Sequence, residues 1–147
     1  MDRTGREEWV VNITADQLRR QEAVFAQAFA KPDLSLARSL YHPKVLYLSP
    51  SVRLFGWPPR IEGVAKTLEF IGLTIENCAS IRYEAVESAC LPDGNSSFVR
   101  VHFDWDHRGQ RLRSNYVVLY RYRDGLIGQQ EIYYDPAGSL GKLAKRA

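Results

Sequence analysis

The spacing of apolar residues in the first part of the chain is typical of a helix. Leu18, Phe25 and Phe29 recur at helical spacing until Pro32 ends the run. The segment Thr14–Gln17 has the pattern of a capping box, in which the Thr accepts a hydrogen bond from the first turn and the Gln reaches back. A helix is therefore predicted between Thr14 and Pro32.

Between Asp33 and Ser80 the pattern predicts two more helices and one strand. Asp33 is a suitable cap for a short helix that ends before His42–Pro43, and Pro50 ends the pairing of the strand. A third helix begins near Gly63 and carries its apolar residues on one stripe. The segments predicted here are a helix through Leu36, Ala37, Leu40 and Tyr41, a strand at Lys44–Ser49, a loop at Ser51–Glu62, and a helix with Val64, Leu68, Ile71 and Ile75.

From Ser80 onward, apolar and polar residues alternate with the period of a strand. Turn residues such as Asp124-Gly125 separate successive strands. The predicted strands are Ile81–Leu91, Ser97–Asp106, Arg111–Arg123 and Ile127–Tyr134. This order predicts an α+β fold, in which three helices pack on one face of a strongly bent, conical antiparallel sheet. Because the sequence has no internal repeat and no linker, we expect residues 1–147 to form a single domain.

The alternation also predicts which side chains point inward. Between Ser97 and Asp106 one face is apolar and the other polar, so the apolar face is expected inside and His102 and Asp104 outside. In the next strand the arginines would be costly to bury, so the opposite face, rich in tyrosine, is expected inside. The inner residues of these two strands are Val99, Val101, Phe103 and Trp105, and Tyr116, Val118, Tyr120 and Tyr122.

An inner surface this rich in tyrosine favours a cavity, since a buried hydroxyl needs a hydrogen-bond partner that water or a ligand can supply. The alternative is that the rings pair with one another and fill the interior. Trp57, on a loop before two prolines, is predicted either to close the mouth of the cavity or to anchor its loop on the third helix. The residues predicted to contact a ligand are Phe25, Tyr47, Ser49, Trp57, Val101, Phe103, Trp105, Tyr116, Val118, Tyr120, Gln130, Ile132 and Tyr134.

Composition narrows the classes of partner. A net charge of +3 is too mild for a nucleic-acid-binding domain, which needs a concentrated basic face. The two cysteines, Cys78 and Cys90, form no close-spaced metal motif and are ordinary residues of a reducing compartment. No apolar run reaches the roughly 20 residues of a membrane span, and the charged segment Met1–Glu8 is unlike a signal peptide. We therefore expect a soluble, cytoplasmic protein with no metal or cofactor.

Two segments carry a family resemblance. Val45–Gly63 reads VLYLSPSVRLFGWPPRIEG, and Tyr120–Pro136 reads YRYRDGLIGQQEIYYDP. The first is similar to the strand, aromatic-Gly loop and Pro-Pro pair of the nuclear-transport-factor-2-like superfamily, and the second to its Asp-Gly hairpin and last strand. The resemblance spans about residues 14–137 and implies a conical sheet wrapped around three helices and a pocket. Members of the superfamily include ketosteroid isomerases, limonene epoxide hydrolases, polyketide cyclases of the SnoaL type, and non-enzymatic binding or assembly domains.

The catalytic residues of these relatives are not retained. The isomerase general base falls on Ser49, its oxyanion-hole tyrosine on Phe25, and its protonated aspartic acid on Val118. Phe and Val neither take up a proton nor donate hydrogen bonds, so we do not expect the ketosteroid isomerase mechanism here. The epoxide hydrolase positions fall on Val99, Val101 and Ile132, and the cyclase acid also falls near Ile132.

His102 and Asp104 are the fallback candidates for acid–base chemistry. They share one face of their strand, where neighbouring side chains lie about 7 Å apart. If the register of this strand differs by one residue, both would face the pocket. A two-His-one-carboxylate metal site would need a second histidine, and His107 in the adjacent turn is poorly placed to converge.

Three functions remain open from the sequence. The first is binding of a small, apolar or aromatic molecule in the pocket. The second is a cyclase- or isomerase-type enzyme that uses Tyr47, Tyr116 or the His102–Asp104 pair, and the third is an assembly module with a vestigial pocket. A homodimer through the outer face of the sheet is also predicted, because Val117 and Leu119 form an apolar centre within a charged rim.

Overall fold

The computed structural model describes residues 12–136 and residue 138. The expectations for Met1–Glu8 and for the basic tail after Gly138 lie outside the described residues. The helices are α2 (Ala15–Ala30) and α3 (Val64–Glu76), with the 3-10 helices η1 (Leu34–Leu40) and η2 (Pro50–Phe55). The strands are β1 (Tyr41–Leu48), β2 (Ile61–Glu62), β3 (Ala79–Cys90), β4 (Ser96–His107), β5 (Gln110–Arg123) and β6 (Leu126–Tyr134).

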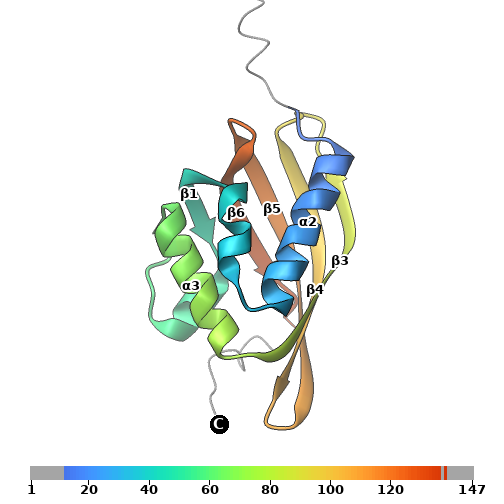
Figure 1. The fold of residues 1–147 in the computed structure, drawn as a ribbon. Helices are drawn as coiled ribbons and strands as arrows, with labels where there is room; N and C mark the ends of the chain where they lie inside the picture. The colour runs from blue at the N-terminus through green and yellow to red at the C-terminus, as the bar shows by residue number, and fades with distance from the viewer. Residues whose placement is uncertain (1–11, 137, 139–147) are drawn as a thin grey trace, which may run out of the picture.

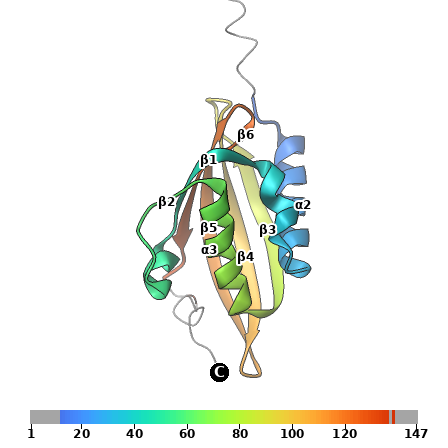
Figure 2. The ribbon, with the colours of Figure 1, turned by 60° about the vertical axis from the view of Figure 1, so that its left-hand side comes forward.

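The six strands form one curved sheet in the order β2-β1-β6-β5-β4-β3. Figures 1 and 2 show α2, η1 and α3 on one face of this sheet, while the described residues place no helix on the opposite face. All strand pairs are antiparallel except β1 with β6, which is parallel. The predicted α+β class, with helices packed on one face of a bent sheet, is confirmed.

The start of α2 follows from its cap. The Thr14 hydroxyl accepts a hydrogen bond from the Gln17 backbone amide at 3.1 Å, and the Gln17 side chain accepts one from the Thr14 amide at 2.9 Å. This reciprocal pair satisfies two amides that the helix itself leaves open. The helix then buries the predicted Leu18, Phe25 and Phe29 against the sheet.

The hairpin that joins β5 and β6 follows from its turn residues. Asp124 and Gly125 have φ angles of 55° and 78°, the left-handed pair that a two-residue hairpin turn requires. Across this hairpin Val118 pairs with Ile132 and Tyr120 with Gln130. The register therefore places these four side chains on the same face of the sheet, as predicted.

The predicted inner faces of β4 and β5 are confirmed. Val99, Val101 and Trp105 have no exposed surface, and Tyr120 is 1% exposed. Outward-facing residues of β5, such as Arg121 and Arg123, are exposed. The period of two thus fixed which side of each strand faces the helices.

Two local predictions were wrong. Tyr41 begins β1 instead of ending the short helix, because Pro43 disfavours helical geometry at His42 and the chain is already extended there. The segment expected to be a loop contains η2 and the two-residue strand β2, which pairs Ile61 with Tyr47. A strand of two residues is too short to show any alternation, so the sequence pattern could not reveal it.

Across the described residues, no helix combines the length and the apolar character needed to cross a membrane.

Candidate functional site: a ring-walled cavity and a buried glutamate

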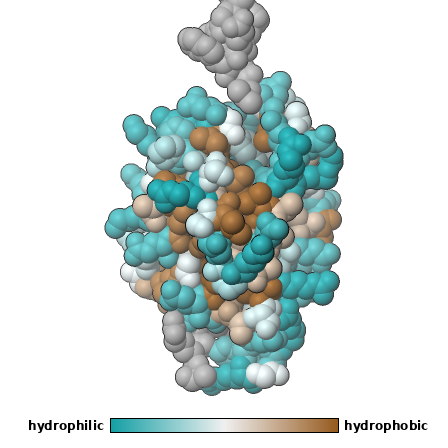
Figure 3. Space-filling model, in the orientation of Figure 1, coloured by the Kyte–Doolittle hydropathy of each residue, from teal (hydrophilic) through white to brown (hydrophobic). Residues whose placement is uncertain are grey.

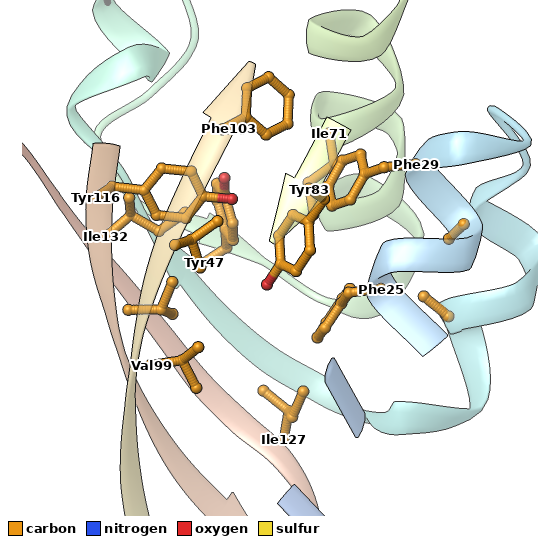
Figure 4. Packing of buried hydrophobic residues seen from close by; sticks show 14 of the residues in the cluster. Phe25, Phe29, Tyr47, Ile71, Tyr83, Val99, Phe103, Tyr116, Ile127 and Ile132 are labelled. Carbon is orange, nitrogen blue, oxygen red and sulfur yellow. The ribbon is translucent and has the colours of Figure 1, made fainter. Parts of the chain in front are cut away.

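A small cavity lies between the inner face of the sheet and the helices α2 and α3. Its volume is about 40 Å³. Figure 4 shows the side chains of Tyr47, Tyr116 and Ile132 facing Phe25, Phe29 and Tyr83 across this interior. The residues that line the cavity are Phe25, Phe29, Tyr47, Ile71, Thr74, Tyr83, Phe103, Tyr116, Val118, Tyr120, Gln130, Ile132 and Tyr134.

Nine of the residues predicted to contact a ligand lie in this wall. They are Phe25, Tyr47, Phe103, Tyr116, Val118, Tyr120, Gln130, Ile132 and Tyr134. The other four do not line it. Val101 and Trp105 are fully buried beside it, and Ser49 places its hydroxyl 2.8 Å from that of Ser51. Trp57 packs its ring edge-on against Phe70, with the ring centroids 5.2 Å apart, so it anchors its loop on α3.

The interior is largely filled by contacts between rings. Phe29 stacks on Tyr83 with centroids 5.1 Å apart and meets Phe103 edge-on at 5.5 Å. Tyr116 and Tyr134 lie 5.2 Å apart at the opposite side of the cavity. A cavity of about 10–15 Å³ is enough to hold one water molecule, so the space left has the scale of a few waters.

Glu22 is the one carboxyl group that α2 buries against this interior, and it is 6% exposed. Its Oε1 accepts a hydrogen bond of 2.5 Å from the Tyr83 hydroxyl, and its Oε2 accepts one of 2.9 Å from the Gln21 amide. The Tyr120 hydroxyl also hydrogen-bonds to this carboxyl group. Burial raises the pKa of Glu22 above its usual value, and the three hydrogen bonds offset part of that rise.

Further polar contacts extend from Glu22 along the inner sheet. Tyr122 donates to Oε1 of Gln21 at 2.9 Å and lies 2.9 Å from the Ser97 hydroxyl. Tyr41 donates to Oε1 of Gln130 at 2.6 Å, and Gln130 lines the cavity. These buried amides and hydroxyls are paired, as the low polarity of the interior requires.

The tyrosines of the cavity are held in their neutral form. Burial is the largest cause of the raised pKa of Tyr83, and the nearby Glu22 raises that pKa further. Burial also raises the pKa of Tyr134 to about 12, although hydrogen bonds to Ser51 and Ser49 lower it in part. A neutral phenol donates one hydrogen bond and accepts others, so these side chains suit a ligand with a carbonyl or hydroxyl group.

An apolar groove lies beside the cavity, between the C-terminal end of α2, η1 and α3. Its volume is about 480 Å³. In Figure 3 hydrophobic surface gathers where these helices meet. Phe29 lines both the groove and the cavity, so its ring forms part of the wall between them. The other residues of the groove are Ala30, Pro32, Leu34, Leu68, Gly72, Ile75, Glu76, Cys78, Ser80 and Ile81.

His102 and Asp104, the fallback acid–base pair, do not face the cavity. Asp104 instead receives two hydrogen bonds from Arg113 on the outer face, at 2.6 and 3.2 Å. These bonds hold the pKa of Asp104 below its usual value. His102 pairs with Glu84 and Asn115 in the neighbouring strands of the sheet, on the side away from the helices.

Among the described residues, no three His, Cys, Asp or Glu side chains come together as a metal site would require.

Comparison with known families identifies the domain. The family model of the SnoaL-like domain matches residues 22–129, which is more than half of the chain. The chain belongs to the SnoaL-like family. The match begins at Glu22, the buried carboxyl group of α2. No curated protein matches this SnoaL-like chain significantly.

Solved structures support the same fold. A putative isomerase from Bacillus subtilis is 22% identical, with 82% of this chain and 85% of that chain covered and a TM-score of 0.65. TerC, co-crystallized with polyporic acid, is 20% identical, with 80% of this chain and 90% of that chain covered and a TM-score of 0.67. A steroid delta-isomerase from Pseudomonas aeruginosa is 19% identical, with 90% of this chain and 89% of that chain covered and a TM-score of 0.64. At these identities the likeness shows the fold alone.

The sequence analysis did not single out Glu22. A signal was present: Leu18, Glu22, Phe25 and Phe29 are spaced by four, three and four residues, so they share one face of the helix. A glutamate within an apolar stripe is rarely buried unless it has partners. Its main partner, Tyr83, comes from a distant strand, and helical spacing alone does not identify it.

Proposed function

We propose that this SnoaL-like protein binds a small, neutral, largely apolar ketone or phenol in the ring-walled cavity and acts on it as an acid–base enzyme of the cyclase or isomerase type. The observation that carries the proposal is the cavity itself, where aromatic rings surround neutral tyrosine hydroxyls. Rings bind an apolar body, and hydroxyls recognise one oxygen of the ligand. The nine predicted contact residues in the wall remain the proposed ligand contacts.

Ligand entry requires the interior to open. A cavity that binds benzene has a volume of about 150 Å³, whereas this one has about 40 Å³. The adjoining groove of about 480 Å³ supplies the space from which a ligand enters. Because Phe29 lines both the cavity and the groove, displacement of its ring would join the two spaces. The proposal therefore includes a change of ring positions on binding.

Titration calorimetry with the aromatic ketone 2-tetralone tests the proposal. Ile132→Phe adds volume inside the cavity, whereas Ile127→Phe makes the same change on the same strand outside the cavity wall. We expect wild type to bind 2-tetralone, Ile132→Phe to bind it about tenfold more weakly, a loss of about 1.4 kcal/mol, and Ile127→Phe to bind it as wild type does. Absence of binding by wild type, or equal affinity of the two variants, would contradict the proposal.

A second proposal concerns self-association through the outer face of the sheet. A hollow of about 420 Å³ on that face is lined by Arg100, Asn115, Tyr116, Val117, Tyr133, Tyr134 and Asp135. Val117 is 38% exposed and Tyr133 is 58% exposed, and the charged residues Arg100 and Asp135 line the same hollow. An apolar and aromatic centre within a charged rim is typical of an interface. This supports a homodimer, whether or not the cavity is catalytic.

A further inference from the structure

The contact between Glu22 and Tyr83 joins a buried acid to the wall of the cavity. Tyr83 lines the cavity, and its hydroxyl is 2.5 Å from Oε1 of Glu22. Glu22 itself is not among the lining residues. Tyr83 is therefore the residue that connects the carboxyl group to the wall of the cavity.

The surroundings of Glu22 are polar but neutral. The titratable groups that act on it or feel its charge are tyrosines: Tyr83 from β3, Tyr41 from β1, and Tyr116, Tyr120 and Tyr122 from β5. Its own helix contributes the Gln21 amide. A carboxylate in such an environment lacks much of the solvation that water gives it, which makes it a stronger proton acceptor than a surface glutamate.

The protonation state of Glu22 decides what Tyr83 offers to the cavity. When Glu22 is a carboxylate it can only accept, so the Tyr83 proton points at Oε1 and the Tyr83 lone pairs remain for the ligand. When Glu22 is a carboxylic acid it can donate to the Tyr83 oxygen, and the Tyr83 proton is then free to point at a ligand carbonyl. The pair thus presents an acceptor in one state and a donor in the other.

We infer that Glu22 and Tyr83 form the proton relay of the cavity, in which Tyr83 is the catalytic residue that contacts an enolisable carbonyl compound and Glu22 is the positioning residue that holds the transferred proton. The inference rests on the proposed binding of such a compound in the cavity. It assigns the acid–base role to residues other than Ser49, Val118 and Ile132, where the related enzymes carry theirs.

The relay step conserves protons and charge. The Tyr83 oxygen takes the proton from the carbon next to the ligand carbonyl while Tyr83 gives its own proton to Oε1 of Glu22. The electron pair of the broken C–H bond becomes the enolate of the ligand, and the single negative charge moves from Glu22 to that enolate. Tyr83 stays neutral throughout. Reversal of the step returns a proton to carbon, and return to a different carbon isomerises the compound.

Hydrogen–deuterium exchange at the α-carbon of 2-tetralone in D₂O, followed by proton NMR, tests the relay without knowledge of the natural substrate. We expect wild type to accelerate the exchange over the protein-free rate. Tyr83→Phe and Glu22→Gln should each slow it by about 100-fold, within the usual range for loss of acid–base catalysis. Tyr133→Phe, which removes an exposed tyrosine hydroxyl that contacts Glu131 and lies outside the cavity wall, should keep the wild-type rate.

The pH profile separates a proton relay from a packing role. In wild type the exchange rate constant should rise with pH as Glu22 ionises and then level off, because only the carboxylate accepts the proton. In Glu22→Gln, which keeps the shape of the side chain, that rise should be absent. If one of the variants Tyr83→Phe and Glu22→Gln melts well below wild type, the comparison uses the other variant. Each of the two substitutions removes the relay by itself.

The outcomes distinguish the relay from the binding on which it rests. Binding of 2-tetralone without accelerated exchange would overturn the relay and leave the proposed binding intact. If Tyr83→Phe and Glu22→Gln both accelerate the exchange as wild type does, the relay is also overturned. Absence of binding would contradict the proposed function and the relay together.

Discussion

The hydroxyl of Tyr83 lies 2.5 Å from Oε1 of Glu22, although 61 positions separate the two residues in the sequence. The helix that carries Glu22 packs on the strand that carries Tyr83, so this contact forms only when the fold is complete. It puts an ionisable group directly behind a wall of neutral rings.

Glu22→Gln should change how stability depends on pH. Because the pKa of Glu22 is raised in the folded state, wild type has its full stability below the unfolded value of 4.5 and loses stability as pH rises towards the folded value. Each unit of difference between the two pKa values corresponds to about 1.4 kcal/mol. Urea unfolding across this pH range should show the loss in wild type and not in Glu22→Gln.

The matched control for this measurement is Glu69→Gln, which neutralises an exposed glutamate on α3. It should follow the wild-type curve. Parallel curves for wild type and Glu22→Gln would mean that Glu22 ionises in the folded state as it does in the unfolded chain.

Phe29→Ala should open the cavity to the groove. Phe29 is 8% exposed and contributes to both walls, so its removal joins the two spaces. Stability should fall by about 3 kcal/mol, as is common when a buried Phe becomes Ala. Stopped-flow measurement should nevertheless show faster association of 2-tetralone than in wild type.

Phe70→Ala is the control for access, because Phe70 is fully buried on α3 but lines neither space. It should lose comparable stability without faster association. If both variants bind at the wild-type rate, Phe29 does not limit entry.

Sedimentation should show a dimer that depends on the outer face of the sheet. Val117→Glu and Leu36→Glu introduce the same charge at positions that are each 38% exposed, one on β5 and one on η1. We expect wild type and Leu36→Glu to sediment as dimers at micromolar concentration and Val117→Glu as a monomer. A monomeric wild type, or a Val117→Glu variant that remains dimeric, would place any contact elsewhere.

Turnover of a Δ5-3-ketosteroid should be absent. Phe25 and Val118 lie in the cavity wall, where they supply neither of the two hydrogen-bond donors of the isomerase mechanism, and the Ser49 hydroxyl is engaged with Ser51. A spectrophotometric assay of the conjugated product should show the rate of the protein-free solution. Turnover at enzymatic rates that Ile132→Phe abolishes would refute this expectation.

Most of the fold could be predicted because the period of the apolar residues reports which face is buried. The alternation through Val99, Val101 and Phe103 placed His102 and Asp104 outside, and the capping box placed the start of α2. The parallel pairing of β1 with β6 has no local signature in the sequence, because it joins segments about 85 residues apart. Closing such a loop costs conformational entropy, which only tertiary packing offsets.

The candidate site was harder to predict than the fold. Eight of the nine predicted lining residues followed from the inner faces of the strands, and Phe25 followed from the family resemblance. The other lining residues are Phe29, Ile71 and Thr74, from helices whose approach to the sheet is set by packing, and Tyr83 from β3. The size of the cavity depends on how closely rings such as Phe29 and Tyr83 stack, which composition does not reveal. Glu22 was missed because glutamate on a helix usually faces water.

The most direct test is a crystal structure of the protein soaked with 2-tetralone. The account predicts the ketone between α2, α3 and the inner sheet, with its oxygen within hydrogen-bond distance of the Tyr83 hydroxyl and the Phe29 ring displaced. A structure in which the ketone is bound elsewhere, or in which the interior keeps its closed ring packing at saturating ketone, would contradict it.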